Sequence, residues 1–277
     1  MTDLRIVLRR AAVCAAVAIA AFAGPALAQT KESVLAKVKR EGVLKVCYAQ
    51  VTPDSYKDPR TGQWTGVFVD LVNELANWMK VKVEPVEVQF GTAPLSLNRG
   101  DCDLFGASLL YNAPRALEIN FVRPFAAKGM NGLVSKDKAG KFTKVEDLNS
   151  PEVTLAVVAG SRDYEVAQRI FPKAKLLALQ VTTDLAAFDS VRRGDADVAL
   201  ANGITIRWWT KVDGNNWAVP AFTSDFSTQP NGWAIRYGDP DWKDFLDSFA
   251  AWIIANNKAQ ELYDSYLSRT SLFDTKK

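Results

Sequence analysis

Apolar and polar residues follow two different periods along this chain, and each change of period marks an expected element. Short apolar runs, typical of buried strands, alternate with stretches whose apolar residues recur every three to four positions, as on one face of a helix. In the first half, strands are expected at 42–49, 81–88 and 104–107, with helices after residues 66 and 90. This order predicts a parallel sheet that is covered by helices.

A second alternation of the same kind occupies the second half of the chain. It predicts strands at 154–159, 175–181 and after Asp195, and helices at 162–171 and 183–193. Two further apolar segments predict crossings between the halves, and the last helices are expected to belong with the first half. The chain is therefore expected to form two lobes with a cleft between them.

A short sequence echo supports this two-lobe interpretation. Arg99 to Ser108 reads RGDCDLFGAS, and Arg193 to Asn202 reads RGDADVALAN. Each follows a segment with helical periodicity and leads into an expected strand, with Ser108 and Asn202 at corresponding positions. Gly-Asp turns before strands are common, so the echo can also arise by coincidence. A repeated helix, turn and strand nevertheless favours two lobes of like construction.

The stretch from Gly100 to Phe121 carries the first candidate for ligand binding. Its expected strand ends in small residues, and open α/β sheets bind small molecules beyond the carboxyl ends of their strands. Arg115 follows, with a planar and permanently charged guanidinium that suits a carboxylate. The alternative is an ordinary exposed arginine in a loop, since arginine is mostly exposed.

Composition narrows the possible chemistry. The 277 residues are 48% apolar and 23% charged, as in ordinary globular proteins, and 34 Lys and Arg face 31 Asp and Glu. Without a basic run, nucleic acid is a poor candidate partner. The absence of histidine excludes Ser-His-Asp and Cys-His sites and removes the commonest metal ligand. We therefore expect no metal and no cofactor.

The first 28 residues have the pattern of a secretory signal peptide. A basic start precedes an Ala/Val/Ile run, and small residues at 26 and 28 predict cleavage after Ala28, before Gln29. The alternative, a membrane anchor, is disfavoured because the run is shorter than the roughly 20 residues needed to span a bilayer and Gly24-Pro25 interrupts it. No later stretch is apolar enough to cross a membrane. The mature protein is expected to be soluble in a bacterial periplasm.

Two cysteines remain after that cleavage, Cys47 and Cys102. In an oxidising compartment they can pair. Both lie beside expected inner strands, where free buried cysteine is also common, and this position favours free thiols. Two thiols without histidine do not make a typical zinc site.

Several segments together give the chain a family resemblance. They are EGVLKVCYA at 41–49, the D-x-x-T-G-x-W-x-G-V-F-V-D-L block at 58–71, RGDCDLFGAS, PRALEINF at 114–121, LAVVAGS at 155–161, RGDADVAL, and the tail helix after GDPDW. In this order and spacing the chain resembles the family 3 extracellular solute-binding proteins, the periplasmic amino-acid receptors of ABC importers.

The resemblance implies an α/β fold of the type II periplasmic-binding-protein class, in which two lobes, each a mostly parallel sheet flanked by helices, are joined by a two-segment hinge. On this basis 1–28 is the signal peptide, 29–128 plus 236–277 form lobe 1, and 129–235 form lobe 2. Hinge segments are expected near 126–132 and 231–236. The implied partners are a small-molecule ligand and an ABC permease of the inner membrane, with the receptor itself a monomer.

The family also implies roles for individual residues. Arg115 is similar to the arginine that grips the ligand α-carboxylate, with the backbone amides of Leu110 and Arg162 as its partners. The second amide is expected on physical grounds as well, because Ser161 is a good N-cap and amides at a helix start bind anions. Ser108 matches a position whose carbonyl accepts from the ligand ammonium, and Phe90 an aromatic that covers the ligand side chain.

Three positions depart from the family pattern. Asn202 stands where the family usually has an aspartate for the α-ammonium, and Leu110 where it usually has a Ser or Thr hydroxyl. An asparagine oxygen lacks the charge that makes ammonium pairing strong. The ligand is then either a carboxylate without an α-ammonium or an amino acid that is bound less tightly. Asp54 replaces an aromatic at the cleft edge, where exposure to solvent is favoured over contact with a cationic ligand group.

Other prominent residues have ordinary alternatives. Phe90 is as compatible with a core position as with a ligand role. Trp208 and Trp209 are adjacent, so on a helix they face different ways, and one of them is expected in the core. The turn and helix-start positions of Asp70, Asp101, Asp103, Asp195 and Asp197 favour capping over catalysis.

Three functions remain open. The first is a receptor that closes on a small carboxylate and presents it to a permease, and this one is favoured. The second is a periplasmic enzyme of the same fold that acts on a prephenate-like acid, against which the sequence has no histidine and no expected cleft acid beyond Asp54 and Glu118. The third is an accessory protein of a periplasmic redox enzyme, which exposed tryptophans at 208 and 209 would favour.

Overall fold

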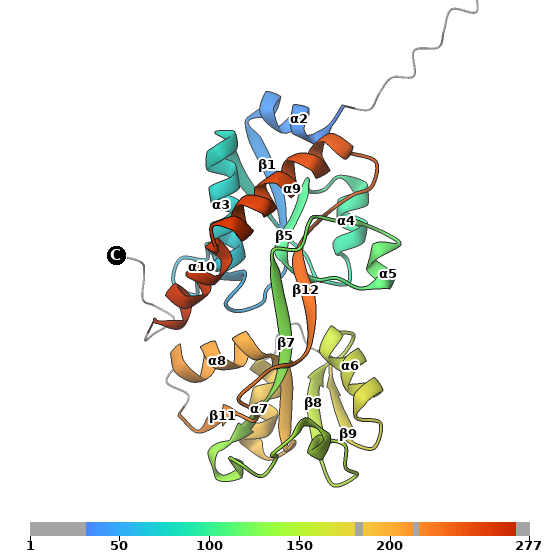
Figure 1. Cartoon of the computed structure of the whole chain (residues 1–277), viewed down its shortest axis with the longest axis vertical. Coiled ribbons are helices and arrows are strands. Elements are labelled where there is room, and N and C mark those ends of the chain that lie inside the picture. The colour runs from blue at the N-terminus through green and yellow to red at the C-terminus, as the bar shows by residue number, and fades with distance from the viewer. Residues whose placement is uncertain (1–31, 181–184, 213–215, 270–277) are drawn as a thin grey trace, which may run out of the picture. The chain divides into compact units, whose positions relative to one another are not determined.

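Figure 1 shows a computed structural model of the protein, which describes residues 32–180, 185–212 and 216–269. The predicted signal peptide, with its cleavage after Ala28, lies outside the described residues, and so does the beginning of the helix expected from residue 183. The helices are α2 (Val34–Glu41), α3 (Val67–Met79), α4 (Ala93–Arg99), α5 (Ala113–Ala116), α6 (Arg162–Ile170), α7 (Leu185–Arg193), α8 (Gly203–Val212), α9 (Pro240–Ala255) and α10 (Lys258–Leu267), with 3-10 turns at Lys136–Lys138 and Val145–Leu148.

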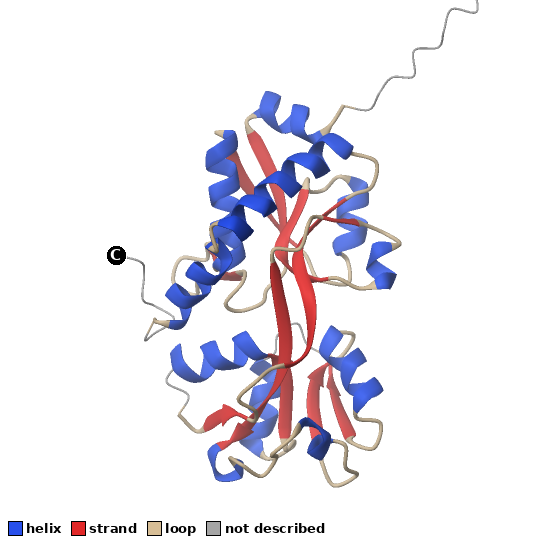
Figure 2. Cartoon of the chain, viewed as in Figure 1, coloured by secondary structure: helices blue, strands red, loops and turns tan. Residues whose placement is uncertain are grey.

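The strands follow the predicted alternation. They are β1 (Val43–Tyr48), β2 (Tyr56–Lys57), β3 (Trp64–Thr65), β4 (Lys82–Glu87), β5 (Leu104–Leu110), β6 (Asn120–Phe121), β7 (Ala126–Ser135), β8 (Thr154–Val158), β9 (Lys175–Leu179), β10 (Val198–Asn202), β11 (Ala218–Pro220) and β12 (Phe226–Ile235). Helices cover both sides of the strands in Figure 2.

Ten of the described strands form one sheet in the order β4-β1-β5-β12-β7-β10-β8-β9, with β6 on β12 and β11 on β7. Strands β4, β1 and β5 are mutually parallel, as are β10, β8 and β9. Two separate sheets were expected, one for each lobe. They are continuous because β7 and β12 pair with each other and each also pairs with one of the parallel groups.

The predicted hinge segments, near 126–132 and 231–236, lie in β7 and β12. In Figure 1 these long strands run side by side from the group that contains β1 and β5 to the group that contains β8 and β10. Both crossings are thus present. The lobe boundaries and a hinge motion stay predictions.

The two RGD-containing segments make equivalent structures. Gly100 and Gly194 end α4 and α7 in the left-handed region, at φ +79° and +83°. The second aspartate of each motif then binds the neighbouring strand: Asp103 accepts from Lys45 N at 3.1 Å, and Asp197 accepts from Thr154 N at 3.0 Å. Each also pairs with a lysine, Lys37 at 2.8 Å and Lys138 at 2.9 Å. The sequence echo is therefore a structural repeat, and these carboxylates hold strands together.

The predicted apolar stripes form the core. On α3, Phe68, Leu71, Val72 and Leu75 are buried, and Met79 packs at their edge. The apolar faces of α9 and α10 are also buried for the most part, with Phe245 and Leu267 partly exposed. Close packing on β5 explains its small residues. A Cβ on Gly106 would lie 2.4 Å from Val46 Cγ1 and 2.9 Å from Val72 Cγ2, so α3 can approach this strand only over a glycine.

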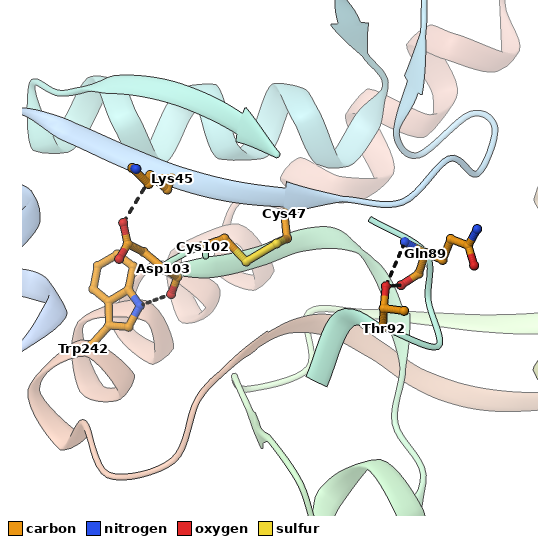
Figure 3. Close-up of a disulfide and its surroundings, with 7 residues drawn as sticks. All are labelled: Lys45, Cys47, Gln89, Thr92, Cys102, Asp103 and Trp242. Atoms are coloured by element: carbon orange, nitrogen blue, oxygen red, sulfur yellow. Dashed lines mark hydrogen bonds between the residues drawn. A yellow bond between two sulfur atoms is a disulfide. The ribbon is translucent and has the colours of Figure 1, made fainter. Parts of the chain in front are cut away.

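Cys47 of β1 and Cys102, just before β5, form a disulfide (Figure 3). The preference for free thiols was wrong. Both cysteines are buried, as expected, but β1 and β5 are neighbours, with Cys47 opposite Phe105, and this register brings the two sulfurs together.

Asp54 is also not where it was expected. It was assigned to solvent, but it is fully buried and forms an ion pair with Lys128 of β7, while the Tyr263 hydroxyl of α10 donates to its other oxygen at 2.6 Å. The Lys128 ammonium further lies over the rings of Phe68 and Tyr263, at 5.3 and 5.1 Å from their centroids. The burial of Asp54 could not be predicted from nearby residues, because its partner Lys128 lies 74 residues away in the sequence, on a crossing strand.

Within the described part of the chain, no helix is both long and apolar enough to span a bilayer.

Candidate functional site

A cavity of about 400 Å³ lies where the two strand groups face each other, and we call it the pocket. Its walls come from the ends of β5 and β10, from the turn before α6, from α8, and from the loop that follows β1. Its lining residues are Gln50, Val51, Thr52, Tyr56, Lys57, Pro59, Phe90, Ser108, Leu110, Arg115, Val158, Gly160, Ser161, Arg162, Asp163, Leu185, Asn202 and Trp208. Every residue of the predicted site except Asp54 is among them.

The end of β5 presents backbone groups on the side away from β12. Leu110 lies opposite Asn231 in a non-hydrogen-bonded pair. The next pair along the strands is the hydrogen-bonded one, because Tyr111 N–H donates to Pro230 O at 3.1 Å. The N–H and C=O of Leu110 therefore face away from β12. Its carbonyl accepts from Arg115 Nη1 at 3.1 Å. Ser108, two residues earlier, also lines the pocket, at a point where the pairing of β5 with β12 shifts register between Leu109 and Phe105.

Arg115 is held by a single turn of helix. The Asn112 side chain caps α5 by accepting from Arg115 N at 2.9 Å, which fixes the backbone from which the guanidinium reaches back to the end of β5. Burial lowers the pKa of Arg115, and the charge of the exposed Glu165 partly opposes this shift. A guanidinium stays protonated in either case, so the pocket contains a permanent, half-buried positive charge.

The amino end of α6 supplies the second group of donors. Ser161 caps the helix, accepting from Tyr164 N at 3.1 Å. The N–H groups of Arg162 and Asp163, at the first two helical positions, have no acceptor within the helix and carry the positive end of its dipole. The predicted cap and the predicted anion-binding amide are thus placed at the pocket.

The side chain of Arg162 has a role that the sequence did not suggest. It is 6% exposed, donates from Nη2 to Ser227 O and lies 3.3 Å from Asp163 Oδ1. Ser227 belongs to β12, where the pairing with β7 shifts register. The guanidinium therefore ties the start of α6 to one of the crossing strands.

Among the described residues that line the pocket, Asp163 is the one acid, and the sequence analysis missed it. The acids expected there were Asp54, which is buried elsewhere, and Glu118, which is exposed and does not line the pocket. Burial raises the pKa of Asp163, and the adjacent Arg162 partly counteracts this. In sequence it is an acid in the first turn of an expected helix, which is typical of a carboxylate that interacts with the helix dipole at the surface.

Asn202 ends β10 and begins α8. Its side-chain oxygen accepts from Ile204 N at 3.0 Å, so it acts as the cap of α8. The oxygen that was expected to face a ligand ammonium is thus bound to the backbone of its own chain.

Aromatic residues form the apolar wall. Phe90 is half-buried and packs on Phe105 with ring centroids 5.9 Å apart, and Tyr56 packs on Trp208 at 5.7 Å. Trp208 and Trp209 are 2% and 7% exposed, so the expectation of one core tryptophan is confirmed, and the second, which was not assigned, is buried as well. They face different neighbours: Trp208 packs on Tyr56 and lines the pocket, and Trp209 packs on Phe188. The exposed tryptophans that would favour a redox accessory role are not found here.

A second cavity of about 720 Å³ adjoins the pocket and shares Gln50, Phe90, Val158, Gly160 and Ser161 with it. We call it the side cavity. Glu87 is its one charged lining residue within the described chain. The Glu87 carboxylate accepts from Lys57 Nζ and, at 2.9 Å, from Gln50 Nε2, and these bonds lower its pKa. No group of three His, Cys, Asp or Glu among the described residues is arranged to hold a metal ion.

Comparison with known proteins places this geometry in a family. The model of the bacterial extracellular solute-binding proteins, family 3, matches residues 44–269. Among curated proteins, the L-cystine-binding protein TcyJ of Escherichia coli is 24% identical over 84% of this chain and 86% of its own. The cyclohexadienyl dehydratase of Pseudomonas aeruginosa is 24% identical over 71% of this chain and 73% of its own.

Solved structures of binding proteins are also similar to this chain. A putative binding component of an ABC transporter from Wolinella succinogenes, complexed with lysine, has a TM-score of 0.76 and 29% identity over 83% of this chain and 97% of its own. The ancestral amino acid-binding protein AncCDT-1, described as a precursor of cyclohexadienyl dehydratase, has a TM-score of 0.75 and 28% identity over 86% of this chain and 100% of its own. The chain therefore belongs to the bacterial extracellular solute-binding proteins of family 3.

Proposed function

We propose that this protein is a periplasmic receptor that binds an amino acid or a related small carboxylate and delivers it to an ABC-type permease. The ligand carboxylate binds the Arg115 guanidinium and the backbone N–H groups of Leu110 and Arg162. The observation that carries the proposal is the position of these donors. A half-buried guanidinium, a strand-end amide and a capped helix start all line one pocket of about 400 Å³.

The two sides of the pocket suggest how ligand binding changes the conformation of the receptor. Arg115 and Leu110 come from the strand group of β5, while Arg162 and Asn202 come from the group of β8 and β10. A ligand that contacts both groups stabilises the arrangement in which they are close, and so shifts an open-to-closed equilibrium about β7 and β12. The closed form is what a permease would recognise.

The names of relatives support the receptor over other functions. Those reported for TcyJ and for the Wolinella protein are of binding proteins, and the latter contains bound lysine. The proposed location in the periplasm follows from the family and from the signal peptide that the sequence predicts. A monomeric receptor is proposed with it.

One observation favours a second candidate, an enzyme that acts on a prephenate-like acid. Asp163 is a carboxyl group in the pocket whose pKa is raised by burial, as a general acid requires, and one relative is a cyclohexadienyl dehydratase. The contact of Asp163 with Arg162 opposes this role, because a nearby guanidinium favours the ionised carboxylate. Incubation with prephenate, followed by absorbance, tests it: turnover that Asp163→Asn abolishes would establish the enzyme.

The receptor proposal is tested by titration calorimetry of the mature protein with a panel of amino, hydroxy and oxo acids. Arg115→Ala should reduce the affinity for any acid that binds by roughly a hundredfold while the fold is kept, since it removes one charge-assisted contact in a formed site. Arg99→Ala, at the exposed end of α4, is the matched control and should bind as the wild type does. Equal affinities for Arg115→Ala and the wild type would refute the anchor.

A further inference from the structure

The charges around the pocket indicate which carboxylates it accepts. The described residues that line the pocket and the side cavity include five charged side chains: Lys57, Glu87, Arg115, Arg162 and Asp163. Two ion pairs account for four of them, Lys57 with Glu87 and Arg162 with Asp163 at 3.3 Å. Arg115 is the one without a carboxylate within salt-bridge distance. Among the described lining residues Arg115 is thus the cation without a direct ion pair. The exposed Glu165, which does not line the pocket, offsets its charge only in part, so the lining suits a ligand of net charge −1.

A standard amino acid is a zwitterion, and its ammonium needs an acceptor, best a charged one. Neither acid among the described lining residues is free for this purpose. Asp163 lies against the Arg162 guanidinium, and the two Glu87 oxygens accept from Lys57 and Gln50. Recruiting either of them would break an existing pair.

Asn202 opposes an ammonium for a different reason. Because its oxygen accepts from Ile204 N, the other end of the side-chain amide is the nitrogen, which only donates. The bond to a backbone N–H also fixes which end is which, since an amide nitrogen could not accept it. A donor faces a ligand hydroxyl or carbonyl oxygen favourably and an ammonium unfavourably.

One acceptor does remain at the α-position. Ser108 lines the pocket, and a backbone carbonyl there can accept from a hydroxyl as well as from an ammonium. It carries no net charge, so it does not replace the missing carboxylate. A neutral carbonyl favours a hydroxy acid, which donates to it, over an oxo acid, which does not. It stabilises an ammonium less than a carboxylate would.

We infer that the pocket selects carboxylates whose α-substituent is uncharged, 2-hydroxy and 2-oxo acids, over the amino acids of the same side chain. The inference rests on the proposed carboxylate anchor and names the ligand class of that same pocket. Phe90, Val158 and Trp208 supply apolar surface for the rest of the molecule. The preferred ligands are hence apolar or aromatic 2-hydroxy acids, with the oxo acids next.

The test uses matched triplets in titration calorimetry: phenyllactate, phenylpyruvate and phenylalanine, and the corresponding acids with the leucine side chain. For the wild type we expect the hydroxy acid to bind at least roughly tenfold more tightly than the amino acid, which is the size of effect caused by a desolvated group without its partner. An amino acid that binds as tightly as its hydroxy acid, or a protein that binds no triplet member, overturns the inference.

Asn202→Asp provides the reciprocal measurement. Aspartate caps a helix as well as asparagine does, so α8 should be kept, while the new charge should reverse the order of hydroxy and amino acid. Asn149→Asp, which adds the same charge where an asparagine accepts from Lys173 N at 2.9 Å outside the pocket lining, should change nothing. An unchanged preference in Asn202→Asp refutes the assignment to this residue.

The two proposals fail in different ways. If Arg115→Ala abolishes binding but amino acids are preferred, only the ligand class is wrong. If Arg115→Ala binds its acids with wild-type affinity, the carboxylate anchor is wrong, whichever member of a triplet is preferred.

Discussion

The buried ion pair of Asp54 and Lys128 allows a sharp test of how the crossing strand β7 is held. Its two side chains are 0% and 1% exposed, and among the described residues no carboxylate other than Asp54 lies within salt-bridge distance of Lys128. Burial lowers the pKa of Lys128, and the charge of Asp54 opposes that shift. Lys128→Met keeps the length of the side chain and removes its charge, so that a buried carboxylate is left without a cation.

The expected cost is about 3–5 kcal/mol in the free energy of unfolding, the range for breaking one side of a buried pair. For a chain of this length that corresponds to a fall in Tm of roughly 6–20 °C. The double variant Lys128→Met with Asp54→Asn removes both charges and retains an acceptor for the Tyr263 hydroxyl. It should recover most of the loss, to within about 2 kcal/mol of the wild type, because replacing both partners is often neutral.

Urea unfolding followed by circular dichroism measures these differences. Lys258→Met is the matched control, since Lys258 pairs with Glu261 at 2.7 Å on the surface, and such pairs contribute about 0–1 kcal/mol. The reasoning is refuted if Lys128→Met costs no more than the control, or if the double variant is no more stable than the single one.

Three further changes test other parts of the account. Replacing Cys47 and Cys102 together by alanine should lower the free energy of unfolding by about 4 kcal/mol, from the chain entropy of a loop of 55 residues, and dithiothreitol should have no further effect on that variant. Gly106→Ala should cost about 1–3 kcal/mol because its Cβ meets β1 and α3, whereas Gly91→Ala, whose Cβ meets nothing within 4 Å, should change the urea midpoint little; equal costs would contradict the packing argument. Ser161→Ala should lose about 1 kcal/mol with the cap of α6 and weaken carboxylate binding in calorimetry, and Ser161→Asn should restore both.

Features encoded locally were predictable from the sequence. The alternation of periods placed the main strands and helices, because each period reflects one buried face. The repeated RGD segments predicted two equivalent turns, and Ser108 and Asn202 after them both line the pocket. The cap at Ser161 needs only its own helix, and it too was found from the residues nearby.

Features that depend on distant partners were not predictable in this way. Asp54 is neutralised by a lysine 74 residues away, and the disulfide depends on the register between β1 and β5. The sequence around Asp163 is typical of an exposed first turn of a helix, yet in the structure this residue lines the pocket. The continuity of the sheet likewise follows from the pairing of β7 with β12, which neither strand specifies alone.

The most direct test of the central claim is a crystal structure of the mature protein with a bound 2-hydroxy acid. We expect the carboxylate to accept from the Arg115 guanidinium and from the N–H groups of Leu110 and Arg162, with the hydroxyl between Ser108 O and the Asn202 amide. A ligand carboxylate that lies elsewhere in the pocket, without contact to Arg115, would contradict this account.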